Sequence, residues 1–373
     1  MSASQPQPDP EVFDVPASTG GLPGVSYVMP VLNEQDYLDA AIATVLAQQY
    51  AGPRELILAL GPSSDATDTI AHDRAEADPR IRIVDNPAAD IPIGMNKAIA
   101  ASRYPIIVRM DAHSELPSDY TSSAVASLAD NDAVNVGGLM LACGRTPFQA
   151  AVAAAYNSRF GLGGTPYHSG GQPGPAESAY LGVFRKDVIT AVGGYDETLR
   201  RGEDWELNLR IRGAGHTVWF EPRLEVRYFP RDSWGRLVRQ FFSTGVWRAE
   251  LVRRHKGRNP VRFFLPPLLV FDLVVCVLLL PLLLTGALQA PVTSTAGLLG
   301  SVVALAYLGP VGYLLVLVLV FVTGPGRAAP GCAQADRHRF VLAVTTMHLA
   351  WGAGFVVGLV GGSKENRDTS RHL

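Results

Sequence analysis

The chain has 373 residues, with 32 basic and 34 acidic side chains, a formal net charge of −2 and a hydrophobic fraction of 47%. This near balance of charge is unlike the strongly basic surface of a nucleic-acid-binding protein, so we expect no nucleic-acid partner. Cys143, Cys276 and Cys332 are far apart and have no C-x-x-C spacing. The spacing argues against a zinc site or a disulfide framework and suits a cytosolic domain.

The apolar residues are unevenly distributed along the chain. Up to Asn259 the sequence alternates as in an α/β domain, and beyond it apolar residues dominate. Residues 1–24 are rich in Pro, Ser and Gly and have neither the basic start nor the apolar run of a signal peptide. We expect them to form a disordered leader, and residues 363–373 to form a short tail.

The first part of the chain predicts an α/β sheet. Short apolar runs that predict buried strands cover residues 25–31, 55–60, 80–84 and 104–110. Helical segments separate these runs, and strands that alternate with helices predict a doubly wound, mostly parallel sheet. In such sheets ligands bind at the carboxyl ends of the strands.

The fourth expected strand ends in Arg109-Met-Asp-Ala-His113. Asp111 and His113, two residues apart at a strand end, can both face one divalent cation. A carboxylate suits Mg²⁺, and a carboxylate with an imidazole also suits Mn²⁺. Taken alone, the pair equally fits a solvated loop in which Asp111 caps the next helix.

Further motifs occur along the chain, and their order decides between a cation site and a solvated loop. They are MPVLNE (29–34), GPSSDAT (61–67), IGMNKAIAAS (93–102), RMDAH (109–113), GGYDE (193–197) and RGEDWEL (201–207). Over roughly residues 25–248 the set resembles family 2 inverting glycosyltransferases, which have a GT-A fold. The D-x-H, RGEDWELN, YFPR and RQFFSTGVWR spellings look most like the succinoglycan-biosynthesis branch.

The resemblance implies a GT-A domain at 25–230, with a nucleotide-sugar half at 25–115 and an acceptor half at 116–230. It implies cation binding by Asp111 and His113, and donor binding by Pro30, Leu32, Glu34, Asp65, Asn96, Lys97 and Asp111. Lys97 equally suits an exposed helix position, and Arg109 could add positive charge. The family usually has a base-contacting Asp where Leu60 and Gly61 stand here. Base recognition would fall to Asp65, Glu34 or backbone groups, which leaves UDP or GDP open.

The acceptor half holds the expected catalytic base. Sugar transfer requires a group that removes the proton of the acceptor hydroxyl, and the resemblance assigns this role to Asp204. An acid at a helix start also complements the helix dipole, which is the structural alternative. Weaker candidates on the acceptor side are Glu203 and Glu206. Residues 161–176, with six glycines and three prolines, form either a lid or a passive connector next to Glu177. His168 in this segment is expected to be a bystander.

The rest of the chain indicates a membrane. Residues 231–262 combine basic and aromatic residues, as in a helix lying in the membrane interface. Within them Gln240, Trp247 and Arg248 loosely match an acceptor-lining Q-x-x-R-W element of processive and lipid-acceptor relatives. Three apolar runs, 264–288, 298–322 and 340–361, follow within residues 263–362. Each exceeds the roughly 20 residues that cross a bilayer core. The third run, which contains Gly, His and Thr, also fits a helix buried in a soluble domain.

The basic residues near these runs predict the topology. They place the catalytic domain in the cytoplasm, at the inner face of the plasma membrane, and the C-terminus outside. Asp272 and His348 lie at a similar depth, and a buried ionisable group needs a partner, so we expect the two to face each other, with Tyr313 as a third member.

The expected function is that of a multi-pass, metal-dependent inverting glycosyltransferase of cell-envelope polysaccharide biosynthesis. It would move sugar from a UDP- or GDP-sugar to a lipid-linked or growing glycan acceptor. A near alternative is a polyprenyl-phosphate glycosyltransferase, for which Asp204 is dispensable. An alternative of another class is a non-catalytic membrane scaffold with a degenerate domain, against which the presence of Asp111, His113 and Asp204 argues.

Overall fold

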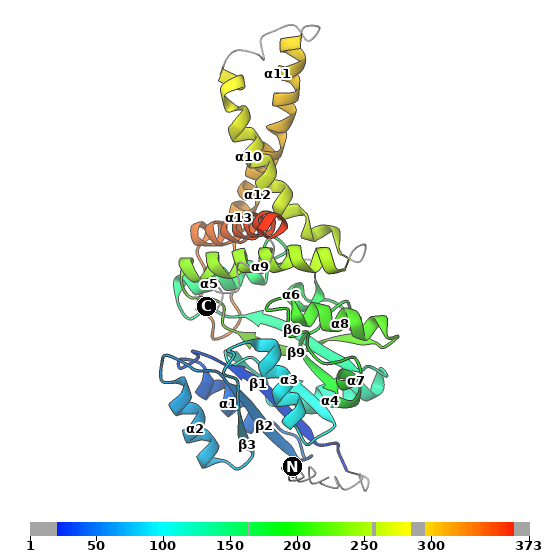
Figure 1. Ribbon diagram of the computed structural model, residues 1–373. Coiled ribbons are helices and arrows are strands. Elements are labelled where there is room, and N and C mark those ends of the chain that lie inside the picture. Colours follow the sequence, from blue (N-terminus) through cyan, green and yellow to red (C-terminus); the bar gives the residue numbers. More distant parts are fainter. Residues whose placement is uncertain (1–20, 163–164, 256–258, 285–294, 362–373) are drawn as a thin grey trace, which may run out of the picture.

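The computed structural model describes residues 21–162, 165–255, 259–284 and 295–361. The expected leader, up to residue 20, and the expected tail lie outside these ranges. Figure 1 shows an α/β domain, two long helices lying across one end of it, and a stalk of further helices that points away from the domain.

A mixed sheet of nine strands, counted over the described residues, forms the middle layer of the domain. Its order is β3-β2-β1-β4-β8-β6-β9-β5, and β7 pairs with β9. The strands are β1 Val25–Val31, β2 Arg54–Leu60, β3 Ile81–Asp85, β4 Ile106–Arg109, β5 Ser114–Glu115, β6 Asn135–Ala142, β7 Gly174–Pro175, β8 Tyr180–Arg185 and β9 Val218–Tyr228.

The pairing confirms the predicted parallel half of the sheet. β1 pairs in parallel with β2 and β4, and β2 pairs in parallel with β3. The acceptor half is different, because β8 runs antiparallel to both β4 and β6. Because β1 and β4 are parallel neighbours, their carboxyl ends lie side by side at the centre of the sheet.

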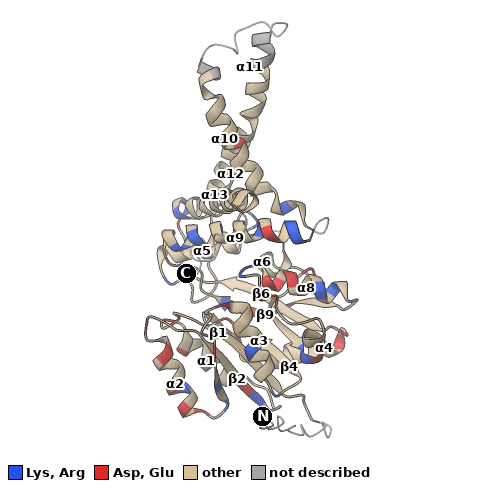
Figure 2. Ribbon diagram, in the orientation of Figure 1, with Lys and Arg blue, Asp and Glu red and all other residues tan. Residues whose placement is uncertain are grey.

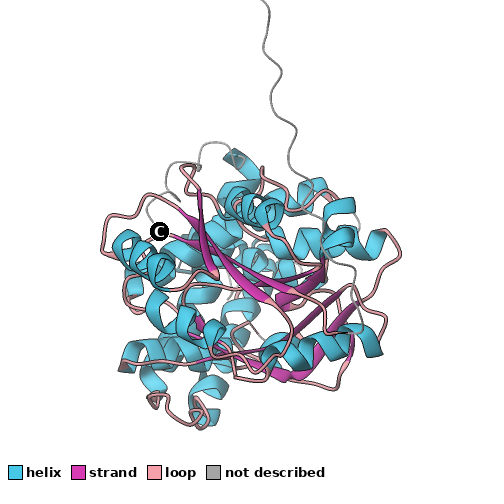
Figure 3. Cartoon of the chain, turned by 90° about the horizontal axis from the view of Figure 1, so that it is seen from below, coloured by secondary structure: helices cyan, strands magenta, loops and turns pink. Residues whose placement is uncertain are grey.

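Helices cover both faces of this sheet, as Figure 3 shows from below. They are α1 Leu38–Leu46, α2 Thr67–Ala77, α3 Ile91–Ala101, α4 Tyr120–Asp130, α5 Pro147–Tyr156, α6 Pro166–Ser169, α7 Lys186–Ala191 and α8 Glu203–Gly213. Alternate residues of β1 belong to two hydrophobic cores, one on each face of the sheet, because successive strand side chains point to opposite faces. Tyr27 and Met29 pack with α1 and α4, whereas Val28 packs with α3 and α8.

Helices also form the rest of the described chain. They are α9 Trp234–Arg254, the short 3-10 helix η1 Val261–Phe263, α10 Leu265–Leu284, α11 Thr295–Ala306, α12 Leu308–Thr323 and α13 Arg337–Gly361. Three helical stretches are long and apolar enough to cross a membrane: Val261–Pro281, Gly300–Thr323 and Arg337–Gly361. Figure 2 shows hardly any charge along the stalk of α10, α11 and α12.

The third of these stretches, α13, packs along α9. At one end Trp234 Nε1 donates to Thr346 Oγ1 at 2.9 Å, and at the other Arg253 Nη1 donates to the Gly358 carbonyl at 2.7 Å. Between these points a side chain at Gly354 would collide with the Phe242 backbone, so glycine permits the close approach of the two helices. In Figure 1 α13 lies beside α9 and across the base of the stalk.

This packing gives α13 more contact with protein than the other two stretches have. In the apolar window of α13, 44% of residues are buried in protein, against 22% and 6% in the other two windows. Hydropathy measures apolar content and cannot tell a protein partner from lipid. If α9 lies in the membrane interface, α13 lies there with it, and both ends of α13 face the side of the domain.

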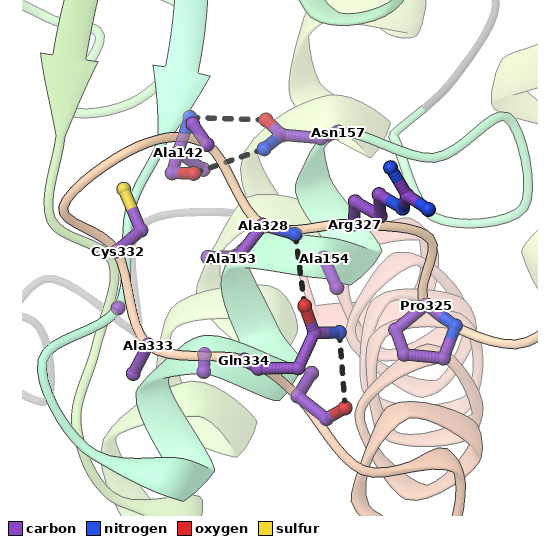
Figure 4. Close-up of a pocket in the computed structure, with 14 residues that line it drawn as sticks. Ala142, Ala153, Ala154, Asn157, Pro325, Arg327, Ala328, Cys332, Ala333 and Gln334 are labelled. Atoms are coloured by element: carbon purple, nitrogen blue, oxygen red, sulfur yellow. Dashed lines mark hydrogen bonds between the residues drawn. The ribbon is translucent and has the colours of Figure 1, made fainter.

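The segment between α12 and α13 folds back onto the domain. Cys332 forms a disulfide with Cys143, and the Ala333 amide donates to the Gly144 carbonyl at 2.8 Å. Figure 4 shows this segment beside Asn157, whose amide bonds both backbone groups of Ala142. The expectation of no disulfide is therefore wrong, because cysteines 189 positions apart meet where the segment returns to β6. The cysteines accordingly give no support for a cytosolic location.

The polar residues expected inside the helix cluster pair only in part. Tyr313 and His348 do meet, with 3.1 Å between the hydroxyl and Nδ1. His348 Nε2 lies 2.7 Å from the Phe160 carbonyl oxygen, so both ring nitrogens are engaged. The expected contact between Asp272 and His348 is therefore wrong, and the Asp272 carboxylate lies against Gly309 instead.

The position of α13 makes a topology prediction. A reporter enzyme fused after Leu373 should appear on the same side of the membrane as one inserted at Ala333, because α13 begins and ends beside α9. A reporter inserted between α10 and α11 is the control and should appear on the opposite side. If the fusions at Leu373 and Ala333 appeared on opposite sides, α13 would cross the membrane as its hydropathy suggests.

Candidate functional site

A cleft opens at the carboxyl ends of β1 and β4. Its inner lobe has a volume of about 140 Å³, and an outer lobe of about 390 Å³ shares Leu32, Glu34, His113 and Arg231 with it. The expected donor-binding and cation-binding residues that line the two lobes are Pro30, Leu32, Glu34, Asp65, Asp111 and His113. The structure thus brings together six of the residues selected from the sequence.

Glu34 and His113 form a pair across the cleft. Glu34 Oε1 lies 2.8 Å from His113 Nδ1, and the Glu34 amide donates to Thr67 Oγ1 at 2.7 Å. Burial lowers the pKa of His113, but the Glu34 carboxylate outweighs burial, so the pKa lies above its ordinary value. A carboxylate on one ring nitrogen fixes the orientation of an imidazole and leaves the other nitrogen available as a ligand.

These contacts fit a divalent cation that brings ligands of its own. Asp111 and His113 line the same lobe, and Glu34 orients His113 from behind. Within the described residues no three His, Cys, Asp or Glu side chains gather as a preformed cage. A set of one carboxylate and one imidazole suits a cation whose remaining ligands come from phosphate oxygens and water.

The inner lobe also contains arginines that the sequence analysis did not select. Arg201 and Arg231 face Asp111 and His113, while Arg200 is paired with Asp90 at 3.1 Å. Burial, followed by the neighbouring charge of Arg231, lowers the pKa of Arg201. Two adjacent guanidinium groups suit an anionic ligand such as a diphosphate.

A sequence signal for these arginines existed. Arg201 directly precedes Gly202-Glu203-Asp204, and Arg231 ends the YFPR segment. Both motifs are among those on which the family resemblance depends. The positions of the arginine side chains depend on how α8 and the end of β9 approach β4, which no local pattern shows.

Arg109, at the end of β4, connects the two halves of the domain. Only 6% of this residue is exposed. Its guanidinium bonds Asp204, and it lies 3.4 Å from both Glu203 Oε1 and Asp111 Oδ1. Burial lowers the pKa of Arg109, but Asp111 and further anionic neighbours outweigh it and raise the pKa above its ordinary value. The positive charge of Arg109 is thus balanced by carboxylates of the protein itself.

The three acids at the start of α8 differ in exposure. The Asp204 side chain is 38% exposed, against 9% for Glu203 and 5% for Glu206. Glu206 binds Arg210 at 2.7 Å, and Glu203 faces Arg109. Asp204 is therefore the most exposed of the three acids, and Glu203 and Glu206 are engaged with arginines.

Two expected donor residues, Asn96 and Lys97, have other partners. Asn96 exchanges hydrogen bonds with the Tyr195 backbone, at 2.8 Å from the amide and 2.9 Å to the carbonyl. Lys97 Nζ donates to the Asp85 carbonyl at 2.8 Å on an exposed part of α3. Neither residue lines the two lobes, and Asn96 holds the GGYDE turn against α3.

The expected acceptor and lid residues are spread over a wider area. Glu177 pairs with Arg262 at 2.7 Å, and Trp247 is buried in a small core with Trp205. The Gln240 amide oxygen is buried with no hydrogen-bond partner. Arg248 lines a second cavity, described below.

The segment expected to be a lid or a connector is anchored at its far end. Gly174 and Pro175 form β7, which pairs with β9. His168 of α6 is buried, and burial lowers its pKa to about 3, so the imidazole is neutral. The described part of this segment is packed against the domain.

Comparison with known proteins agrees with this architecture. The pattern of glycosyl transferase family 2 matches residues 26–193. The succinoglycan biosynthesis protein ExoA of Rhizobium meliloti (strain 1021) is 32% identical over 332 residues, which cover 88% of this chain and 92% of that protein. The fold and the matched motifs define a glycosyltransferase. The chain belongs to glycosyltransferase family 2.

A solved structure supports the fold. The mannosyltransferase PcManGT from Pyrobaculum calidifontis, in complex with GDP-Man and Mn²⁺, has a TM-score of 0.55 and 17% sequence identity. The match covers 91% of this chain and 88% of that one. The predicted GT-A fold, followed by long apolar helices, is confirmed.

Proposed function

We propose that this glycosyltransferase moves a sugar from a nucleotide-sugar donor to a glycan acceptor at a membrane surface, with inversion at the anomeric carbon. The observation that carries the proposal is the position of Asp204. Its carboxylate is half-exposed, and Arg109 holds it next to Asp111 of the cleft. A base held beside the donor site is the arrangement that a single displacement requires.

The donor is a nucleoside diphosphate sugar. Arg201 and Arg231 supply positive charge where the leaving diphosphate would lie, and Asp111 and His113 would hold a Mg²⁺ or Mn²⁺ ion. Such an ion, when bound, stabilises the negative charge of the diphosphate oxygens as a Lewis acid. The Mn²⁺ and GDP-Man bound to PcManGT support this assignment, and a UDP-sugar suits the same chemistry.

Asp204 performs the proton transfer. It accepts the proton of the acceptor hydroxyl while the hydroxyl oxygen forms a bond to the anomeric carbon. The bond from that carbon to the diphosphate breaks on the opposite side, which inverts its configuration. Arg109 fixes Asp204 Oδ1, so the carboxylate is oriented before the acceptor arrives.

The acceptor is a lipid-linked or growing glycan, and the setting is the inner face of the plasma membrane. The succinoglycan biosynthesis relative supports a role in polysaccharide biosynthesis. The apolar helices α10 to α12 support anchoring in the membrane. The basic residues before α10 support a cytoplasmic domain. With α9 and α13 in the interface, the cleft would lie close to the lipid surface.

The role of Asp204 makes a direct prediction. Asp204→Asn keeps the size of the side chain but removes its basicity, so transfer should fall by about 10²–10⁴-fold, the usual effect of losing a general base. Binding of the nucleotide sugar should be retained. Transfer is measured in membranes with a panel of nucleotide sugars, and Asp187→Asn, an exposed acid of α7, is the control.

Two outcomes would contradict this role. Full transfer by Asp204→Asn would favour an acceptor that needs no base, such as a polyprenyl phosphate. Equal loss of donor binding and transfer would mean that Asp204 only stabilises the start of α8.

The cation site makes a second prediction. Asp111→Ala removes one of the two ligands, so Mn²⁺-dependent binding of a nucleoside diphosphate should weaken by at least about tenfold. Titration of the purified protein with Mn²⁺ and the nucleotide measures this binding, with EDTA as the metal-free reference. Binding of the nucleotide by Asp111→Ala that responds to Mn²⁺ as in the parent protein would exclude the site.

A further inference from the structure

A second cavity is lined by Trp205, the residue that follows Asp204 in α8. Its volume is about 650 Å³, larger than either lobe of the cleft. Its walls come from the segment between α5 and α6, from α8 and α9, and from the first turns of α10 together with α12 and α13. The domain and the apolar helices therefore form this cavity jointly.

Several residues that line the cavity have buried polar atoms without a hydrogen-bond partner. Among the described residues, Arg248 Nε and Nη1, Trp205 Nε1 and Trp351 Nε1 are buried and make no hydrogen bond. His168 Nδ1 is buried in the same state. Native proteins rarely leave such groups unpaired, and here four side chains share one cavity. The pattern indicates a ligand rich in acceptor oxygens.

The cavity is also positively charged. Arg159, Arg248 and Arg262 line it, and no Asp or Glu is among the described lining residues. Arg262 is paired with Glu177, whereas Arg248 contacts aromatic rings, with 4.0 Å between its guanidinium carbon and the Phe263 ring centroid. Burial lowers the pKa of Arg248 to about 10, so the guanidinium is charged at neutral pH. A buried cation without a carboxylate partner suits a phosphate group.

The remaining wall is apolar and continues onto the stalk. Leu265, Pro266 and Leu269 of α10 and Val316 of α12 line the cavity. Leu265 and Val316 are 60% and 39% exposed, and Figure 2 shows hardly any charge along the stalk. A long apolar chain bound in the cavity can therefore leave it directly into lipid.

We propose that this cavity binds the phosphate or diphosphate group of a lipid-linked acceptor. Arg248 and the indole groups of Trp205 and Trp351 hold the phosphate oxygens, and the lipid chain leaves along α10 and α12. Trp205 directly follows Asp204 at the start of α8, so the cavity lies at the same helix end as the proposed base. The inference rests on the proposed transferase function and names the chemical class of its acceptor.

Binding of radiolabelled farnesyl diphosphate to the full-length protein in detergent micelles tests the proposal. Arg248→Met should weaken binding by about 10- to 100-fold, the effect of losing a charged hydrogen bond. Trp351→Phe keeps the ring, removes only the N–H, and should weaken binding by several-fold. Arg223→Met, at an exposed arginine of β9 that is 77% accessible, is the matched control and should bind as the parent does.

Competition identifies what the cavity recognises. Unlabelled farnesyl diphosphate should displace the label at least about tenfold better than farnesol, inorganic diphosphate or phosphatidylglycerol vesicles. Equal affinity of Arg248→Met and the parent protein would overturn the proposal, and so would equal displacement by phosphatidylglycerol or by farnesol. Thermal unfolding of each variant shows whether it is folded. If Arg248→Met is misfolded, Arg248→Lys replaces it. Arg248→Lys keeps the charge but loses the planar fork of the guanidinium, so it should bind more weakly than the parent protein.

Nucleotide binding, measured on the same samples, separates the two proposals. Lipid binding without nucleotide binding would overturn the transferase function and leave the site intact. If the protein binds nucleotide and transfers sugar, but Arg248→Met binds the lipid as the parent does, only the proposed lipid site is overturned.

Discussion

The buried guanidinium of Arg109 is the constraint on which the catalytic centre depends. It ends β4, the central strand next to β1, and contacts Asp111 of the donor half together with Glu203 and Asp204 of the acceptor half. Three carboxylates in one place would repel each other, and a single buried cation offsets that repulsion. Because the same guanidinium contacts both halves, it also fixes how far Asp204 lies from Asp111.

Two cavities differ in chemistry. The cleft at β1 and β4 is polar and holds Asp111, His113 and paired arginines, whereas the cavity between the domain and the apolar helices combines an apolar wall with Arg159, Arg248 and Arg262. The helices α9 and α13, packed together across the end of the domain, form the floor that positions the second cavity relative to the stalk.

The sequence predicted the strands and the strand-end residues well, because apolar runs and motif order are local signals. Asp111, His113 and Glu34 meet as expected, since parallel strands bring their carboxyl ends to one edge. Contacts between distant segments could not be predicted in this way. Two such contacts are the disulfide between Cys143 and Cys332 and the packing of α13 on α9. Both form only because the chain folds back onto distant segments. The contact of Asn96 with the Tyr195 backbone is of the same kind, because a polar residue in a motif can bond a distant turn.

The coupling between Arg109 and Asp204 is the most direct test of the cluster. Chemical unfolding of the full-length protein in detergent gives the free energies of unfolding for Arg109→Met, Asp204→Asn and the double variant. If Arg109 anchors the acids, Asp204→Asn should cost less in the Arg109→Met background than in the parent, by about 0.5–3 kcal/mol, because it removes a charge that has lost its partner. Free energies that add within about 0.5 kcal/mol would show that the two side chains do not act together.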